Sequence, residues 1–140
     1  RRPESEVNRL MTLFMHSLDK ETPELTNKGV AIRFIGDLTA FSDKLQAKMA
    51  EVAALKPQQP RLVLNVAVNY GGRWDIVSAA RKMAVKFRQG TLDIADMDEA
   101  LFHRFTCLSD QPAVDVMIRT GGEHRISNFL LWQCDTVAGF

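Results

Sequence analysis

The residues best suited to chemistry lie between Arg119 and Asn128, near the C-terminal end of the printed sequence. Arg119 and Arg125 flank a Gly-Gly pair, and Ser127 and Asn128 add short polar side chains. Glycines let backbone N–H groups approach a ligand, and guanidinium groups form paired, charge-assisted hydrogen bonds with phosphate oxygens. The pattern predicts an anion-binding loop whose arginines could hold a diphosphate from two sides. The alternative is that both arginines pair with carboxylates such as Glu123, or with helix ends, on the surface.

Three further groups of polar residues have weaker signals. His124 could act as an acid, a base or a metal ligand, or could be a solvated loop residue, and magnesium prefers oxygen ligands. The segment 69–75 could touch a ligand, or could form a tight turn in which Trp74 covers the core and Asp75 lies in the first turn of a helix. Asp37 could likewise touch a ligand, or could be a loop carboxylate that caps a turn. The sequence alone does not decide among these alternatives.

Composition and missing motifs narrow the class of protein. A net charge of +1 and a pI of about 8.0 provide no basic field for nucleic acid, so we expect a small partner. Dinucleotide, P-loop, serine-hydrolase and zincin motifs do not occur. Cys107 and Cys134 lack metal-ligand spacing, and no apolar run is long enough to span a membrane. We therefore predict a soluble, cytoplasmic protein with reduced thiols.

Helical and strand patterns alternate along the chain. The spacing of apolar residues and the turn residues predicts, in chain order, a helix over 4–20, a strand over 30–34, a helix capped by Ser42, a strand over 62–68, a helix ending near Gly90, a helix over 94–105 and a strand over 114–118. The strand 62–68 is apolar on both faces except at Asn65, which is typical of a central strand between two layers of helices. The prediction is one α/β domain over 1–140, with a mainly parallel central sheet surrounded by helices.

Two details of this prediction concern the ends and faces of helices. Thr22-Pro23 is expected to end the first helix, because proline disrupts helix interiors. The helix ending near Gly90 is expected to direct one apolar face inward, made of Ile76, Val77, Ala80, Met83 and Phe87. Ligands gather beyond the carboxyl ends of parallel strands, so 36–37, 69–74 and 119–128 are the predicted functional segments.

The string RTGGEHRISNFLLWQ, which begins at Arg119, resembles the most characteristic C-terminal motif of the cis-prenyltransferase family. The family's N-Y-G-G-R-x-[DE]-I segment matches 69–76, and its I-G-D segment matches 35–37. Arg2-Pro3 resembles the end of its N-W-x-R-P motif. The resemblance therefore covers 1–133, with its motifs in the family's order.

The resemblance implies a homodimeric fold in which a hydrophobic tunnel holds the growing prenyl chain. The implied reaction condenses isopentenyl diphosphate onto farnesyl diphosphate with magnesium, forming cis double bonds until undecaprenyl diphosphate, a lipid carrier for cell-wall synthesis, is complete. Product release implies transient contact with a membrane surface. By the same resemblance, His124 contributes to magnesium binding and Val30 and Leu62 lie near the tunnel. The substrate-binding residues that it implies are Arg2, Arg119, Arg125, Ile126 and Ser127.

Two parts of the family pattern do not occur in the printed residues. The D-G-N-G-R-W motif, which carries the family's catalytic aspartate, is not among the 140 residues, so no catalytic residue is assigned. After Gln133 the match ends, and Ala138 stands where the family has a metal-binding glutamate. We expect no condensing activity from these 140 residues alone. The alternatives are a non-catalytic partner subunit, against which the segment 69–76 argues, and a general diphosphate-binding module.

Overall fold

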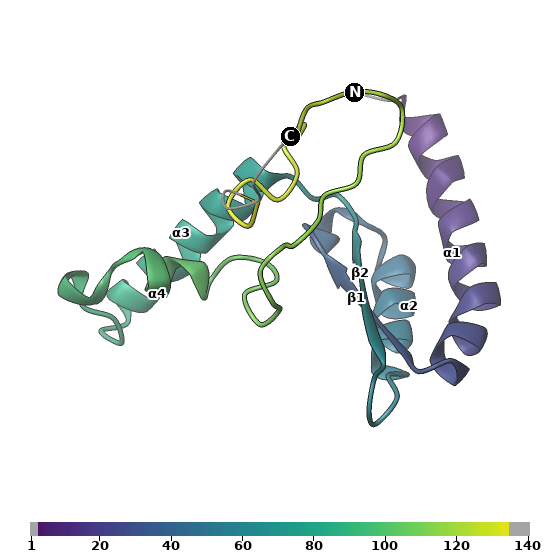
Figure 1. Ribbon diagram of the computed structural model, residues 1–140, viewed down its shortest axis with the longest axis horizontal. Coiled ribbons are helices and arrows are strands. Elements are labelled where there is room, and N and C mark those ends of the chain that lie inside the picture. The colour runs from purple at the N-terminus through teal and green to yellow at the C-terminus, as the bar shows by residue number, and fades with distance from the viewer. Residues whose placement is uncertain (1–2, 135–140) are drawn as a thin grey trace. The chain divides into compact units, whose positions relative to one another are not determined.

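Helices and two parallel strands alternate along the chain in the computed structural model, which describes residues 3–134 (Figure 1). The elements are α1 (Glu4–Asn27), β1 (Val30–Ile35), a 3-10 turn (Leu38–Ala40), α2 (Asp43–Ala54), β2 (Leu62–Ala67), α3 (Gly72–Arg88), a second 3-10 turn (Ile94–Asp96) and α4 (Glu99–His103). The chain divides into two units, Arg1–Asn69 and Tyr70–Phe140, and each is described by itself.

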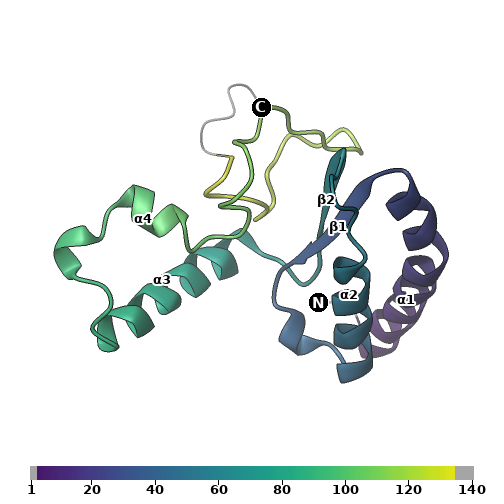
Figure 2. The same ribbon diagram turned by 90° about the horizontal axis from the view of Figure 1, so that it is seen from below.

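In the first unit, α1 and α2 lie on the same side of the two strands (Figures 1 and 2). The strands pair in parallel, with a register that runs from Val30 opposite Leu62 to Ile35 opposite Ala67. The core between this sheet and the two helices contains Leu18, Val30, Ile32, Leu45, Met49 and Val52. Ser42 caps α2 as predicted, because its Oγ accepts a hydrogen bond from the Leu45 N–H at 3.3 Å. The predicted α/β class with a parallel sheet is confirmed.

α1 continues past Pro23, so the prediction that it ends near residue 20 is wrong. Leu18 and Thr22 are buried on this helix, and Leu25 packs against the core. The buried stripe thus keeps its helical spacing through the proline. Burial of these side chains outweighs the one hydrogen bond that proline cannot donate. The helix ends just before Gly29, whose φ of 83° only glycine adopts readily.

β2 forms as predicted, but the prediction that it is covered on both faces is wrong for the part of the chain that the structure describes. Leu62 is 59% exposed and Leu64 is 40% exposed. The described sheet has only two strands, and α1 and α2 both pack against β1. β1 is therefore the more deeply buried strand, while the first half of β2 lies beyond the cover of the helices.

α3 buries a face that shares only Met83 with the one that the sequence predicted. Its buried residues are Gly72, Asp75, Ala79 and Met83, whereas Val77 and Phe87 are exposed. The sequence did not predict the burial of Gly72 and Asp75, because hydrophobicity gives no reason to bury a glycine or an aspartate. Gly72 is buried because Leu131 packs closely on it: a Cβ atom at Gly72 would lie 2.6 Å from the Leu131 Cγ.

The helix predicted over 94–105 is two short elements, the second 3-10 turn and α4. Asp93 begins the first, since its Oδ1 accepts a hydrogen bond from the Ala95 N–H at 3.3 Å. Asp98 begins the second and accepts from the Leu101 N–H at 2.8 Å. Each aspartate starts its own turn by binding a backbone N–H group, and this interrupts a continuous helix.

The predicted strand 114–118 is not a strand in the described residues. Val116 is 72% exposed and Ile118 is 83% exposed. Alternating apolar residues favour an extended backbone, but a strand also needs a neighbouring strand for its N–H and C=O groups. The pattern is present here without such a partner.

No helix among residues 3–134 is long and apolar enough to cross a membrane.

Candidate anion-binding site

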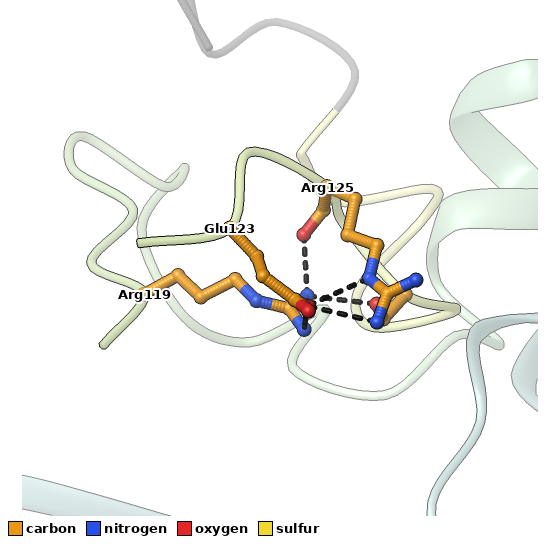
Figure 3. A network of polar contacts seen from close by, with 4 residues as sticks. Arg119, Glu123 and Arg125 are labelled. Atoms are coloured by element: carbon orange, nitrogen blue, oxygen red, sulfur yellow. Dashed lines mark hydrogen bonds and ion pairs between the residues drawn. The ribbon is translucent and has the colours of Figure 1, made fainter. Parts of the chain in front are cut away.

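Arg119 and Arg125 converge on the carboxylate of Glu123 in the second unit (Figure 3). The Glu123 Oε2 lies 3.0 Å from the Arg119 Nη2, 2.9 Å from the Arg125 Nε and 2.8 Å from the Arg125 Nη2. The other side of the Arg119 guanidinium is also engaged: Nη1 donates to the Arg125 carbonyl at 2.5 Å and to the Ser127 Oγ at 2.7 Å. Three of the predicted site residues therefore meet, and both arginines pair with Glu123.

These residues line a cavity of about 640 Å³. Its polar wall includes both arginines, and Ile126, predicted as a substrate-binding residue, is also part of the lining. His124 lines the same cavity, beside Glu123 in the sequence. The apolar part of the wall includes Met117, Ile118 and Phe129. One cavity thus joins two guanidinium groups to an apolar surface, an arrangement suited to a ligand with an anionic head and an apolar tail.

The backbone of this loop takes conformations that few residues adopt. Gly121 and Gly122 have φ values of 99° and 72°, and form the turn that the sequence predicted. Ser127, Asn128 and Leu130 also have positive φ values, of 49°, 59° and 47°. Such conformations are costly for residues other than glycine and often occur at functional sites. The surrounding contacts must hold this loop in place.

Asn128 supplies one of these contacts by binding the N-terminal end of α3. Its carbonyl accepts a hydrogen bond from the Gly72 N–H at 2.7 Å, and its Oδ1 accepts from the Arg73 N–H at 2.9 Å. These N–H groups have no partners within the helix, so Asn128 acts as a cap supplied by a distant segment. The arginine loop is thereby attached to the N-terminal end of α3, within the second unit.

Asp75 is a buried carboxylate whose importance the sequence did not indicate. Its Oδ2 accepts hydrogen bonds from the Tyr70 hydroxyl and the Gln133 Nε2, both at 2.8 Å, and its Oδ1 accepts from the Cys107 N–H at 2.9 Å. Burial, together with the hydrogen bond to Asp75, raises the pKa of Tyr70, so its hydroxyl remains a donor. The network joins α3 to the segments around Cys107 and Gln133.

Asp37 and Asn69 lie together in the first unit, as expected for residues that follow parallel strands. The Asp37 N–H donates to the Asn69 carbonyl at 3.2 Å, and the Asn69 Nδ2 donates to the Asp37 carbonyl at 3.0 Å. The Asp37 carboxylate accepts from the Thr39 N–H and hydroxyl at 3.2 and 2.6 Å. Asp37 therefore caps a turn, which was one of its two predicted roles.

The other described residues that the sequence predicted are not part of the cavity lining. Val30 and Leu62 are opposite each other on neighbouring strands of the first unit, where Val30 is buried and Leu62 is exposed. Arg2 and Ala138 lie outside the described residues. Cys107 and Cys134 are not in a disulfide bond, in agreement with the prediction of reduced thiols, and burial raises the pKa of the Cys134 thiol.

Within 3–134, no three histidine, cysteine, aspartate or glutamate side chains come together in a way that could hold a metal ion. His124 contributes one imidazole to the cavity wall, whereas magnesium prefers oxygen ligands. No chemical step is therefore assigned to a metal here.

The geometry defines an α/β protein with a cavity lined by paired arginines and apolar side chains. Residues 1–138 match the sequence profile of the family described as "Putative undecaprenyl diphosphate synthase". The chain belongs to this family, the cis-prenyltransferases.

Curated relatives and solved structures agree with this assignment. The chain is 47% identical over 132 residues to ditrans,polycis-undecaprenyl-diphosphate synthase ((2E,6E)-farnesyl-diphosphate specific) of Escherichia coli strain K12, which covers 94% of this chain and 52% of the relative. The enzyme of the same name from Xanthomonas axonopodis pv. citri is 50% identical, with 94% and 51% covered. The chain thus spans about half the length of these relatives.

Two solved structures are similar in fold and sequence. Lavandulyl diphosphate synthase from Lavandula x intermedia, in complex with dimethylallyl diphosphate, superimposes with a TM-score of 0.88 at 36% identity, covering 95% of this chain and 58% of that one. A probable undecaprenyl diphosphate synthase from Campylobacter jejuni gives a TM-score of 0.83 at 31% identity, with 98% and 62% covered. The family resemblance read from the sequence motifs is confirmed.

Proposed function

We propose that this chain carries the part of a cis-prenyltransferase that binds isopentenyl diphosphate. In the whole protein, this substrate would be condensed onto farnesyl diphosphate, with cis double bonds, to make undecaprenyl diphosphate. The observation that supports the proposal most directly is that one cavity is lined both by Arg119, Arg125 and Ser127 and by the apolar residues Met117, Ile118 and Phe129. The relatives from Escherichia coli and Xanthomonas, named as specific for farnesyl diphosphate, support the choice of reaction.

In the proposed complex the two guanidinium groups bind the diphosphate of isopentenyl diphosphate. Arg119 is held from behind by the Arg125 carbonyl and the Ser127 hydroxyl, so its planar group is oriented before a ligand arrives. The apolar wall receives the five-carbon chain. This fixed orientation would place the double bond beside the allylic carbon of the second substrate, and catalysis by the bound residues would consist of positioning and charge stabilisation.

Several parts of the proposal extend beyond this cavity. His124 is the candidate contact for magnesium, which would supply positive charge to neutralise the diphosphate of a substrate. Val30 and Leu62 are proposed to lie along the tunnel for the growing chain, and Arg2 to contact a diphosphate. A homodimer, and transient contact with a membrane surface during product release, complete the proposal.

Ligand binding tests the proposal, because we predict that these 140 residues alone do not condense the substrates. Isothermal titration of the chain with isopentenyl diphosphate and with inorganic diphosphate compares the two ligands directly. We expect isopentenyl diphosphate to bind more tightly, since only it reaches the apolar wall. Arg119→Ala and Arg125→Ala should each weaken binding by about tenfold or more. Arg88→Ala, an exposed cation at the last turn of α3, is the matched control and should leave the affinity unchanged.

Two results would contradict the proposal in different ways. Equal affinity for the two diphosphates would identify a general diphosphate-binding module. An absence of binding, or equal losses in Arg88→Ala and the two cavity variants, would show that the cavity is not the binding site.

A further inference from the structure

Glu123 occupies the place between the two arginines where an anionic ligand would bind (Figure 3). A single oxygen, Oε2, accepts three charge-assisted contacts at 2.8–3.0 Å. The cluster is accessible: the side chains of Arg119, Glu123 and Arg125 are 34%, 52% and 67% exposed. A carboxylate in this setting is held by hydrogen bonds that water or another anion can replace.

We propose that Glu123 is an internal competitor of the diphosphate, which must leave the two arginines before a ligand can bind them. This inference rests on the proposed function, since it concerns the same site. In the unliganded chain, the carboxylate relieves the repulsion between two neighbouring cations. A bound diphosphate takes over that role, and Glu123 turns away towards solvent.

The loop has the parts that such an exchange requires. Glu123 follows Gly121 and Gly122, whose positive φ values allow wide changes of backbone direction. Apart from the adjacent residues in the chain, no atom lies within 4 Å of the position of a Cβ on either glycine, so this segment has open space around it. Arg119, by contrast, keeps its contacts with the Arg125 carbonyl and the Ser127 hydroxyl when Glu123 leaves. Glu123 can therefore turn away while the Arg119 guanidinium stays in position to bind the ligand.

The exchange has a simple thermodynamic consequence. If every anion must displace Glu123, the cost of displacement is the same for each of them, and the affinity of each is reduced by the same factor. Weak anions then fail to bind at ordinary concentrations, while a diphosphate with contacts to both arginines still binds. If Glu123 instead stayed beside the ligand, its repulsion would grow with the charge of the ligand.

The test compares the chain with its Glu123→Gln variant, which has nearly the same shape without the charge. Each is titrated calorimetrically with inorganic phosphate and with inorganic diphosphate at one ionic strength. We expect both ligands to bind the variant about fivefold more tightly, as suits the loss of one exposed ion-pair cluster. The ratio of the two affinities should not change. Glu99→Gln, in the first turn of α4, removes the same charge elsewhere in the unit and should change neither affinity.

The other outcomes separate this inference from the proposed function. Unchanged or weaker binding by Glu123→Gln, with normal binding by the parent chain, overturns the competitor role alone. A gain that is clearly larger for diphosphate than for phosphate also overturns it, because Glu123 would then remain beside the ligand. If neither ligand binds either chain, the proposed function fails together with the inference. Glu123→Ala should reproduce the result of Glu123→Gln, which guards against a folding defect peculiar to one variant.

Discussion

Asp75 and Glu123 each have three close polar contacts, which are three hydrogen bonds at Asp75 and two hydrogen bonds with a further ion-pair contact at Glu123, but their surroundings differ. Asp75 is 2% exposed and receives its hydrogen bonds from a tyrosine hydroxyl, a backbone N–H group and a glutamine. Glu123 is half exposed and receives its contacts from two cationic side chains. The donors around Asp75 are partly buried, so water replaces a lost partner less readily there than at the exposed contacts of Glu123. The same number of contacts therefore stabilises the fold at Asp75 and leaves an exchangeable site at Glu123.

The largest predicted effect is on stability at Asp75. Asp75→Ala leaves the partly buried Tyr70 hydroxyl and Cys107 N–H without their acceptor, whereas the Gln133 Nε2 keeps its hydrogen bond to the Cys107 carbonyl. We expect the free energy of unfolding to fall by about 3 kcal/mol. Glu123→Ala should change it by less than about 1 kcal/mol. Urea titrations followed by the near-ultraviolet circular dichroism of Tyr70 and its neighbour Trp74 measure both values. Equal losses in the two variants would remove the distinction between the two carboxylates.

A smaller effect is expected at Asn128, which attaches the arginine loop to α3. Asn128→Ala loses the hydrogen bond to the Arg73 N–H. It also places alanine, which adopts positive φ values less readily than asparagine, at a φ of 59°. The expected loss of unfolding free energy is about 1–2 kcal/mol. Asn128→Gly loses the same hydrogen bond but adopts this φ readily, so its loss should be smaller. The same urea titrations compare the two variants. A glycine variant no more stable than the alanine variant would show that the left-handed backbone is not under strain.

The smallest predicted effect is a pH dependence of the free energy of unfolding, caused by Tyr70 in the Asp75 network. The pKa of Tyr70 is raised in the folded chain above its ordinary value of 10.0, chiefly by burial. The folded state then holds this proton more tightly than the unfolded state, so the stabilisation is complete below pH 10 and is lost as the pH rises above it. We expect the free energy of unfolding to decline above pH 10. Tyr70→Phe should show a shallower decline, and parallel declines would contradict the assignment to Tyr70.

Local signals in the sequence were sufficient for the arginine loop and several caps. Gly121 and Gly122 were expected to form a turn, because few other residues adopt positive φ values, and they do. Ser42 was expected to cap a helix, and capping a turn was one of two roles open to Asp37; the side-chain oxygens of both bind nearby N–H groups. The family motifs at 35–37, 69–76 and from Arg119 onward were sufficient to identify the family. Each of these signals depends on a few adjacent residues.

The predictions that failed depended on distant residues. The strand 114–118 lacks a partner in the described residues, and a strand pattern cannot reveal whether a partner exists. Pro23 was expected to end α1, but burial of Leu18 and Leu25 on either side of it keeps the helix intact. Asp75 was placed correctly in a first helical turn, but its burial depends on Cys107 and Gln133, far along the chain.

The sequence by itself determined the α/β class, the turn chemistry of the arginine loop and membership of the family, because these follow from local backbone preferences and contiguous motifs. Only the tertiary structure decided that Asn128 caps α3, that Asp75 is a buried acceptor, and that Glu123 lies between Arg119 and Arg125. The physical reason is that hydrogen bonds and burial depend on which segments meet in space. Residue types state what a side chain can do, and its folded neighbours decide which of those roles it takes.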